Sequence, residues 1–159
     1  MELNKIKPTK TILLVEDNPA HVLITKEAFQ EVEREDEPYH IELVNVRDGI
    51  LALQHLSYCK SKGKYPDLIM IDINLPKLNG LDLLKKIKIH KSFRVIPSII
   101  MTNGSRGQEI NEAYDRNANA FIIKPFKYDD FLEMIRLLKH FWFDFTTIVN
   151  TTLGDLHGK

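Results

Sequence analysis

The chain has little of what marks a secreted, membrane or nucleic-acid-binding protein. Its one cysteine, Cys59, cannot form an internal disulfide and suits a reducing compartment. No apolar run approaches the roughly 20 residues of a membrane span, and the start, Met1 to Lys5, lacks a signal-peptide core. The 22 Lys and Arg residues balance the 22 Asp and Glu residues, so no overall field attracts nucleic acid or an anionic membrane. We expect a cytoplasmic protein with no membrane partner and no direct nucleic-acid binding.

The hydrophobic content is sufficient for one core. At 159 residues and 43% hydrophobic, the chain fits a single globular domain. Residues 67–72 hold four consecutive apolar residues between two aspartates, and residues 11–15 form a second continuous apolar run. Such runs are typical of strands buried on both faces, because a half-buried strand would alternate polar and apolar residues.

Periodicity predicts five strands alternating with five helices. The expected strands are residues 11–15, 41–46, 67–72, 96–101 and 120–123. The expected helices are residues 19–33, a second from residue 49, residues 80–90, a short fourth around residues 110–114, and residues 128–145. Residues 33–38 and 57–66 are expected to be loops, the first of them solvated. This order favours a doubly wound parallel sheet in a three-layer α/β domain.

Charged and hydroxyl side chains follow the predicted strands. They are Glu16 and Asp17, Asp72, Thr102 and Lys124, and the carboxyl ends of parallel strands meet at one edge. Three carboxylates brought together repel unless a hard divalent cation such as Mg²⁺ lies among them. Asp72 could then attack a phosphoryl group as a nucleophile, with Lys124 supplying positive charge and Thr102 a hydrogen bond. Taken singly, each also has an ordinary structural explanation, such as a turn cap or a surface cation.

Together with Leu75–Pro76, Gly80 and Pro125, these residues resemble the receiver domain of two-component response regulators over about residues 9–143. The resemblance implies a flavodoxin-like fold in which Asp72 accepts phosphate from a histidine kinase. It further implies that Asp17 binds Mg²⁺ directly, that Glu16 binds it largely through water, and that Asn74 offers its backbone carbonyl. Lys124 would pair with the phosphorylated carboxylate. Thr102 would move toward the phosphoryl group and let Phe121 turn inward.

A narrower resemblance links the chain to small cyanobacterial regulators paired with phytochrome kinases. It rests on residues 16–20, the lysine-bearing loop before Pro66, and residues 140–142. Two positions depart from the general family pattern. Asn103 stands where the family usually has a smaller residue, so the access of water or of the kinase to the phosphoryl group would differ. Phe121 has no hydroxyl, so its switch would rest on packing alone.

Two other functions are consistent with the same topology. A flavin-binding electron carrier would need a glycine- and hydroxyl-rich phosphate cradle after the first strand, where this chain has Glu16 and Asp17. A receiver-like scaffold that no longer accepts phosphate is the other, and the retained charged residues argue against it. The histidines, His21 among them, show no metal-ligand spacing and are expected at the surface.

The last predicted helix carries more apolar side chains than the sheet can cover. We assign residues 9–145 to the receiver domain and residues 146–159 to a short tail, too short for an output domain. The tail could fold over the second apolar stripe of the helix. We favour a homodimer through the fourth helix, fifth strand and fifth helix, because exposed aromatic stripes mark interfaces. The stripe consists of Met134, Leu137, Phe141 and Phe145.

Overall fold

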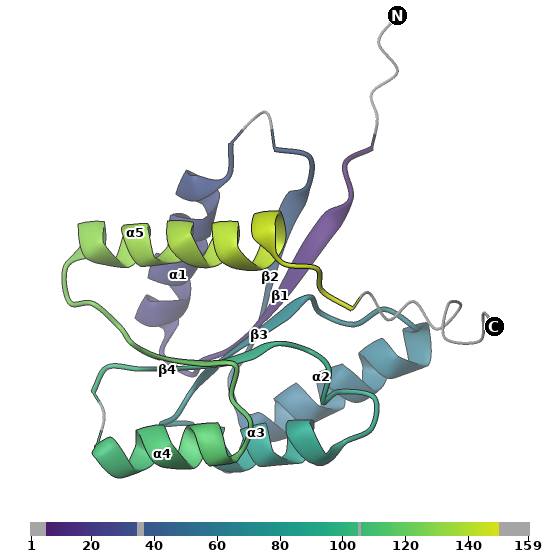
Figure 1. Cartoon of the computed structure of the whole chain (residues 1–159), viewed down its shortest axis with the longest axis vertical. Helices are drawn as coiled ribbons and strands as arrows, with labels where there is room; N and C mark the ends of the chain where they lie inside the picture. Colours follow the sequence, from purple (N-terminus) through teal and green to yellow (C-terminus); the bar gives the residue numbers. More distant parts are fainter. Residues whose placement is uncertain (1–5, 35–36, 105, 150–159) are drawn as a thin grey trace, which may run out of the picture.

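The computed structural model, which describes residues 6–34, 37–104 and 106–149, is a five-stranded parallel sheet between two layers of helices (Figure 1). The strand order is β2-β1-β3-β4-β5, so the doubly wound prediction is confirmed. The strands are β1 Thr9–Val15, β2 His40–Val46, β3 Leu68–Asp72, β4 Ser98–Thr102 and β5 Ala120–Ile123. The helices are α1 Pro19–Val32, α2 Gly49–Lys62, α3 Gly80–Ile89, α4 Gly107–Asp115, α5 Tyr128–Lys139 and the π-helix η1 His140–Phe145.

Helices cover both faces of the sheet. Helices α1 and α5 lie on one face, and α2, α3 and α4 lie on the other (Figure 1). Successive residues of β1 point to opposite faces: Ile12 and Leu14 join the core under α1 and α5, whereas Leu13 and Val15 join the other. Strands β3 and β4 are buried along their whole length. Burial on both faces explains why these segments read as continuous apolar runs.

The register brings the strand ends to one edge. Val15 pairs with Ile71, Asp72 with Met101, and Thr102 with Ile123. The chain leaves β1 toward β2 and later returns to β3 on the other side of β1, so the strand order reverses between these two strands. Ligands of open α/β sheets bind in the crevice at such a reversal. Residues that follow β1 and β3 are therefore placed in that crevice.

Two predicted boundaries were wrong. The segment expected to be a loop from residue 57 belongs to α2 as far as Lys62, where Ser57 Oγ donates to the Leu53 carbonyl at 2.9 Å. The helix ends at Gly63, whose φ of 66° is a left-handed conformation that glycine adopts without a Cβ penalty. Strand β4 begins at Ser98 rather than at residue 96, because Pro97 lacks the N–H that a central strand needs.

The last helical segment reaches Phe145, as predicted, but its last six residues are π-helical rather than α-helical. The α-helix stops at Lys139, and residues 140–145 form the π-turn η1, in which Thr146 N donates to Phe141 O at 3.1 Å. Glu37, expected in a solvated loop, is buried and pairs with the buried Lys139. Tyr39 reinforces this junction by donating to Asp144 Oδ1 at 2.5 Å. These contacts fasten the end of the helix to the segment before β2.

The tail, which is the alternative to a second copy of the chain as the cover of this helix, falls mostly outside the described residues, which end at residue 149. Within the residues that the structure describes, no helix is both long and apolar enough to span a membrane.

Candidate functional site

The centre of the site is the ammonium group of Lys124, which bridges two carboxylates. The residue directly follows β5, and its N–H donates to the Thr102 carbonyl at 2.8 Å. Its Nζ donates to Glu16 Oε2 at 2.6 Å and to Asp72 Oδ2 at 2.7 Å. All three side chains are buried. One cation thus offsets two carboxylates that the ends of β1 and β3 bring together, and buried charges require such a partner.

The second oxygen of each carboxylate is held by the backbone. Asp72 Oδ1 accepts from Asn74 N at 2.7 Å, and Glu16 Oε1 accepts from Asn18 N at 3.0 Å. The side chain of Asn18 in turn caps α1 by accepting from Ala20 N at 2.9 Å. Both acidic side chains are therefore held in place by the turns that leave their strands.

The remaining predicted site residues lie around this pair without all converging on it. Asp17 is exposed, and the described part of the chain contains no group of three His, Cys, Asp or Glu residues able to hold a metal ion as they stand. Glu16 and Asp72 share the ammonium group of Lys124, and Asp17 lies next to Glu16 in the chain with its side chain exposed, so its part in a metal site stays a prediction. Asn74 is exposed in the following loop.

The predicted switch residues make hydrogen bonds to groups other than Asp72. The buried hydroxyl of Thr102 donates to the Gly104 carbonyl at 2.7 Å rather than to Asp72. Phe121 is half-buried, and its N–H donates to the hydroxyl of Tyr114 in α4 at 3.3 Å. The aromatic position in β5 is thereby joined to α4 by a hydrogen bond.

The donor atoms around Lys124 fit a hard divalent cation. Glu16 and Asp72 already place carboxylate oxygens within 2.6 and 2.7 Å of one positive charge, and Asp17 is adjacent in sequence with an exposed side chain. Magnesium prefers carboxylate and carbonyl oxygens and keeps several waters. For a metal ion to bind among these residues, the side chain of Asp17 would have to turn inward or the ammonium group of Lys124 would have to move away.

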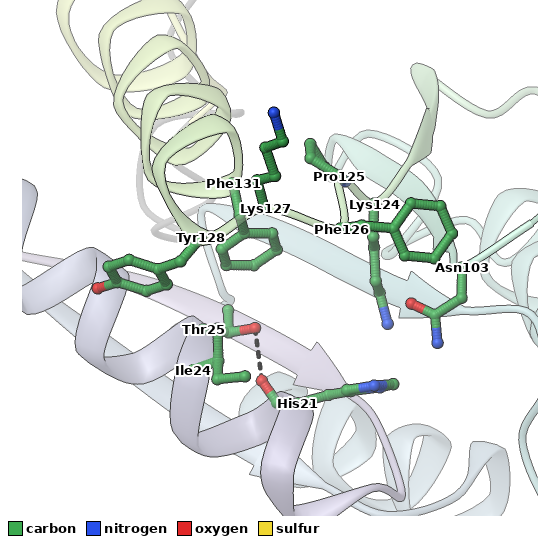
Figure 2. A pocket seen from close by; sticks show the side chains of 10 residues that line it. All are labelled: His21, Ile24, Thr25, Asn103, Lys124, Pro125, Phe126, Lys127, Tyr128 and Phe131. Carbon is green, nitrogen blue, oxygen red and sulfur yellow. Dashed lines mark hydrogen bonds between the residues drawn. The ribbon is translucent and has the colours of Figure 1, made fainter.

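A groove gives access to this site from the side of α1. It has a volume of about 340 Å³ and lies between α1 and the segment that joins β5 to α5. Figure 2 shows the side chains of His21, Asn103 and Lys124 pointing toward one another in it. Phe126 in its wall is 94% exposed. A small phosphoryl donor or a side chain of a partner can therefore reach Lys124.

His21 is a site residue that the sequence did not reveal. Its Nδ1 lies 3.4 Å from Glu16 Oε2 and is buried with no hydrogen-bond partner among the described residues. We expected a surface histidine, since it has no metal-ligand spacing. Its position in the sequence could have indicated this placement. His21 lies in the first turn of α1, five residues after Glu16, and side chains of a helix tilt toward its N-terminus, which here is the end next to β1.

The fold and the charges at its strand ends define a class of protein. The chain belongs to the response regulator receiver domain family, which matches residues 12–136. Its members are phosphoacceptors rather than turnover enzymes.

Among its relatives, the response regulator Rcp1 of Synechocystis sp. is 30% identical over 146 residues, covering 89% of this chain and 94% of Rcp1. The probable methanogenesis regulatory protein FilR2 of Methanothrix harundinacea is 33% identical over 132 residues, 82% of each chain.

Solved structures give the same result. The phosphorylated cyanobacterial phytochrome response regulator RcpA superposes with a TM-score of 0.79 at 29% identity, covering 89% of this chain and 99% of that one. The Mn²⁺-bound form of Rcp1 superposes with a TM-score of 0.76 at 28% identity, covering 87% and 98%. The predicted receiver domain and its likeness to phytochrome regulators are thus confirmed.

Proposed function

We propose that Asp72 accepts a phosphoryl group from a histidine kinase of phytochrome type in a Mg²⁺-dependent reaction. The observation that carries the proposal is the pair of contacts from Lys124 Nζ to Asp72 Oδ2 and Glu16 Oε2. A carboxylate that must receive a phosphoryl group needs compensating positive charge beside it, and Lys124 provides that charge. The similarity to RcpA, a cyanobacterial phytochrome response regulator, supports the kinase type.

The chemistry is a single displacement at phosphorus. A carboxylate oxygen of Asp72 attacks the phosphorus of a phosphohistidine. A P–O bond forms as the P–N bond breaks, and the electron pair leaves with the imidazole of the kinase. Lys124 holds the carboxylate and neutralises charge on the transferred group. Bound Mg²⁺ supplies further positive charge to the phosphoryl oxygens.

Oxygen atoms of three residues would hold the cation directly. We assign direct ligation to Asp17, Asp72 and the backbone carbonyl of Asn74, with Glu16 acting largely through water. The Mn²⁺-bound form of Rcp1 supports a divalent cation in a chain of this fold.

The surface change would begin at Thr102. The hydroxyl would leave the Gly104 carbonyl, which it reaches at 2.7 Å, and turn to the phosphoryl group. The vacated space would let Phe121 turn inward on packing alone, and its backbone bond to Tyr114 would transmit the change to α4. Asn103, which lines the groove beside Lys124, would limit access of water to the phosphate.

The output surface in this proposal is a homodimer through α4, β5 and α5. A groove of about 620 Å³ runs between β5 and α5, lined in part by Met134 and Leu137. Leu137 is 61%, Phe141 54% and Phe145 81% exposed. A second copy of the chain is the occupant we propose, because its own aromatic stripe supplies the apolar surface that such a groove covers.

The proposal includes a cytoplasmic location and a division into a receiver domain at residues 9–145 and a tail at residues 146–159. The free thiol of Cys59 is compatible with a reducing compartment. Against a flavin carrier stands Glu16, whose carboxylate lies at the end of β1 where a flavin phosphate would bind. Against an inactive scaffold stands the contact between Lys124 and Asp72.

The kinase assignment is tested by phosphotransfer. A phytochrome-type histidine kinase and an unrelated histidine kinase are each labelled on histidine and mixed with this protein and Mg²⁺. We expect rapid transfer from the first and slow transfer from the second. Equal rates from both kinases would contradict the phytochrome assignment while leaving Asp72 as acceptor.

A further inference from the structure

The loop between β3 and α3 (residues 73–79) contains a strained turn. Lys77 has a φ of 64°, which is uncommon for a residue with a side chain, and Leu78 N donates across it to Pro76 O at 2.7 Å. A three-residue turn closed in this way around a residue of positive φ is rare and strained. Such strain persists only where surrounding contacts enforce it.

An ion pair to a neighbouring helix holds this turn. Lys77 Nζ donates to Asp48 Oδ2 at 2.8 Å. Asp48 is buried and caps α2, where its other oxygen accepts from Leu51 N at 2.8 Å. The hydrogen bond from Lys77, with that from Leu51, lowers the pKa of the Asp48 carboxyl, so the carboxylate is charged at neutral pH. The loop thus binds to a carboxylate that the helix itself keeps in place.

The loop also packs closely against the first residue of α2 through Leu78, the residue after Lys77. A Cβ at Gly49, the first residue of α2, would lie 2.8 Å from Leu78 O and 2.9 Å from Leu78 Cβ. At the other end of the loop, Asn74 N donates to Asp72 Oδ1 at 2.7 Å. The loop is therefore fixed to α2 on one side and to the proposed phosphoacceptor on the other.

We propose that Lys77 and Asp48 are positioning residues whose ion pair holds the β3–α3 loop so that Asn74 presents its N–H to Asp72 and its carbonyl to the divalent cation. The inference rests on the proposed function, since it explains how that site is kept ready. Neither residue touches the phosphoryl group. They act by keeping the strained turn closed, and without their ion pair the loop would relax and move the backbone of Asn74.

The test is a Mg²⁺ titration by calorimetry on the full chain and its variants. Lys77→Met keeps the apolar stem and removes the charge, and we expect about five-fold weaker binding of Mg²⁺. Lys77→Gly loses the ion pair but accepts the positive φ without strain, so the turn has less tendency to open and the affinity should fall less than in Lys77→Met. Lys77→Arg should restore most of the affinity. The matched control is Lys10→Met, whose ion pair with Asp67 lies at the opposite end of the sheet, and its affinity should not change.

A second readout needs no metal. Amide hydrogen exchange at Asn74 should quicken about five-fold in Lys77→Met and to a smaller degree in Asp48→Asn, which keeps the helix cap. The double variant should exchange no faster than Lys77→Met alone, because both changes break one contact. Unchanged Mg²⁺ affinity and unchanged exchange in Lys77→Met would overturn the inference. A parent protein that takes no phosphate on Asp72 would overturn the proposed function instead, and the exchange measurement would still decide whether the ion pair holds the loop.

Discussion

Gly80 lies so close to Asp72 that a Cβ at this position would stand 2.1 Å from the Asp72 carbonyl oxygen. The first residue of α3 and the last residue of β3 are thus in direct contact through their backbones. Gly80 N also donates to Ile73 O at 2.9 Å. The backbone of Asp72 is therefore packed against the start of α3 as well as paired within the sheet.

Substitution of Gly80 by alanine should therefore disturb both stability and function. The atoms in the way belong to the backbone and cannot rotate aside, so we expect a loss of about 2–3 kcal/mol in the free energy of unfolding, with reduced phosphate acceptance. Urea unfolding measures the first. Gly107→Ala is the control, because nothing lies within 4 Å of its Cβ position, and equal stability of both variants would contradict the account.

Replacement of Lys124 by methionine removes the cation that Glu16 and Asp72 share. Without Mg²⁺ we expect a loss of about 3 kcal/mol in stability, because two buried carboxylates are left without a counter-charge. The variant should bind Mg²⁺ more tightly than the parent, since the ion no longer competes with an ammonium group. Asp17→Ala should change the affinity in the opposite direction. Weaker Mg²⁺ binding by Lys124→Met in calorimetry would show that the lysine does not occupy the place of the ion.

The double variant Phe141→Asp with Phe145→Asp should remove self-association. Sedimentation of the parent, with and without phosphorylation, should show a dimer in at least one state, and the variant should be monomeric in both. Ile89→Asp is the control, since Ile89 is as exposed but lies on α3, away from the proposed interface. A parent that stays monomeric in every state at micromolar concentration would remove the dimer and leave the tail as the cover.

Lys88 should make the free energy of unfolding rise with pH in the alkaline range. Its ammonium donates to Ile96 O at 2.8 Å and to Asn119 Oδ1 at 2.9 Å, and burial lowers its pKa from 10.5 to about 8. Because the unfolded chain binds the proton more tightly, the folded state gains stability as pH rises from about 8 to 10.5 and loses it as pH falls back through 8. The free energy of unfolding should rise with pH in the parent relative to Lys88→Met. Parallel curves for the two proteins would contradict the lowered pKa.

The site could be located from the sequence because ligands of open parallel α/β sheets bind at the carboxyl ends of the strands, and strand ends can be predicted from apolar runs. Glu16, Asp72 and Lys124 each lie at the end of a predicted strand, and the structure places Lys124 Nζ 2.6 Å from Glu16 Oε2 and 2.7 Å from Asp72 Oδ2. Side-chain direction does not follow from that rule. The sequence could not predict that Asp17 points to solvent or that Thr102 bonds to Gly104.

Contacts between segments far apart in the chain could likewise not be predicted from the sequence. Glu37 and Lys139 are 102 positions apart, and each alone resembles a solvated charge. The helical continuation from Ser57 to Lys62 was missed because its polar residues break the apolar period. Lys77 gave no signal either, since a positive φ at lysine is a consequence of its surroundings.

The most direct test of the account is the site of phosphorylation. The protein is incubated with acetyl phosphate or a phosphorylated kinase and Mg²⁺, and its peptides are mapped by mass spectrometry. The account predicts one alkali-labile phosphoryl group on Asp72 that depends on Mg²⁺ and is absent from Asp72→Asn. Undiminished labelling of Asp72→Asn, or a phosphoryl group on any other residue of the parent, would contradict it.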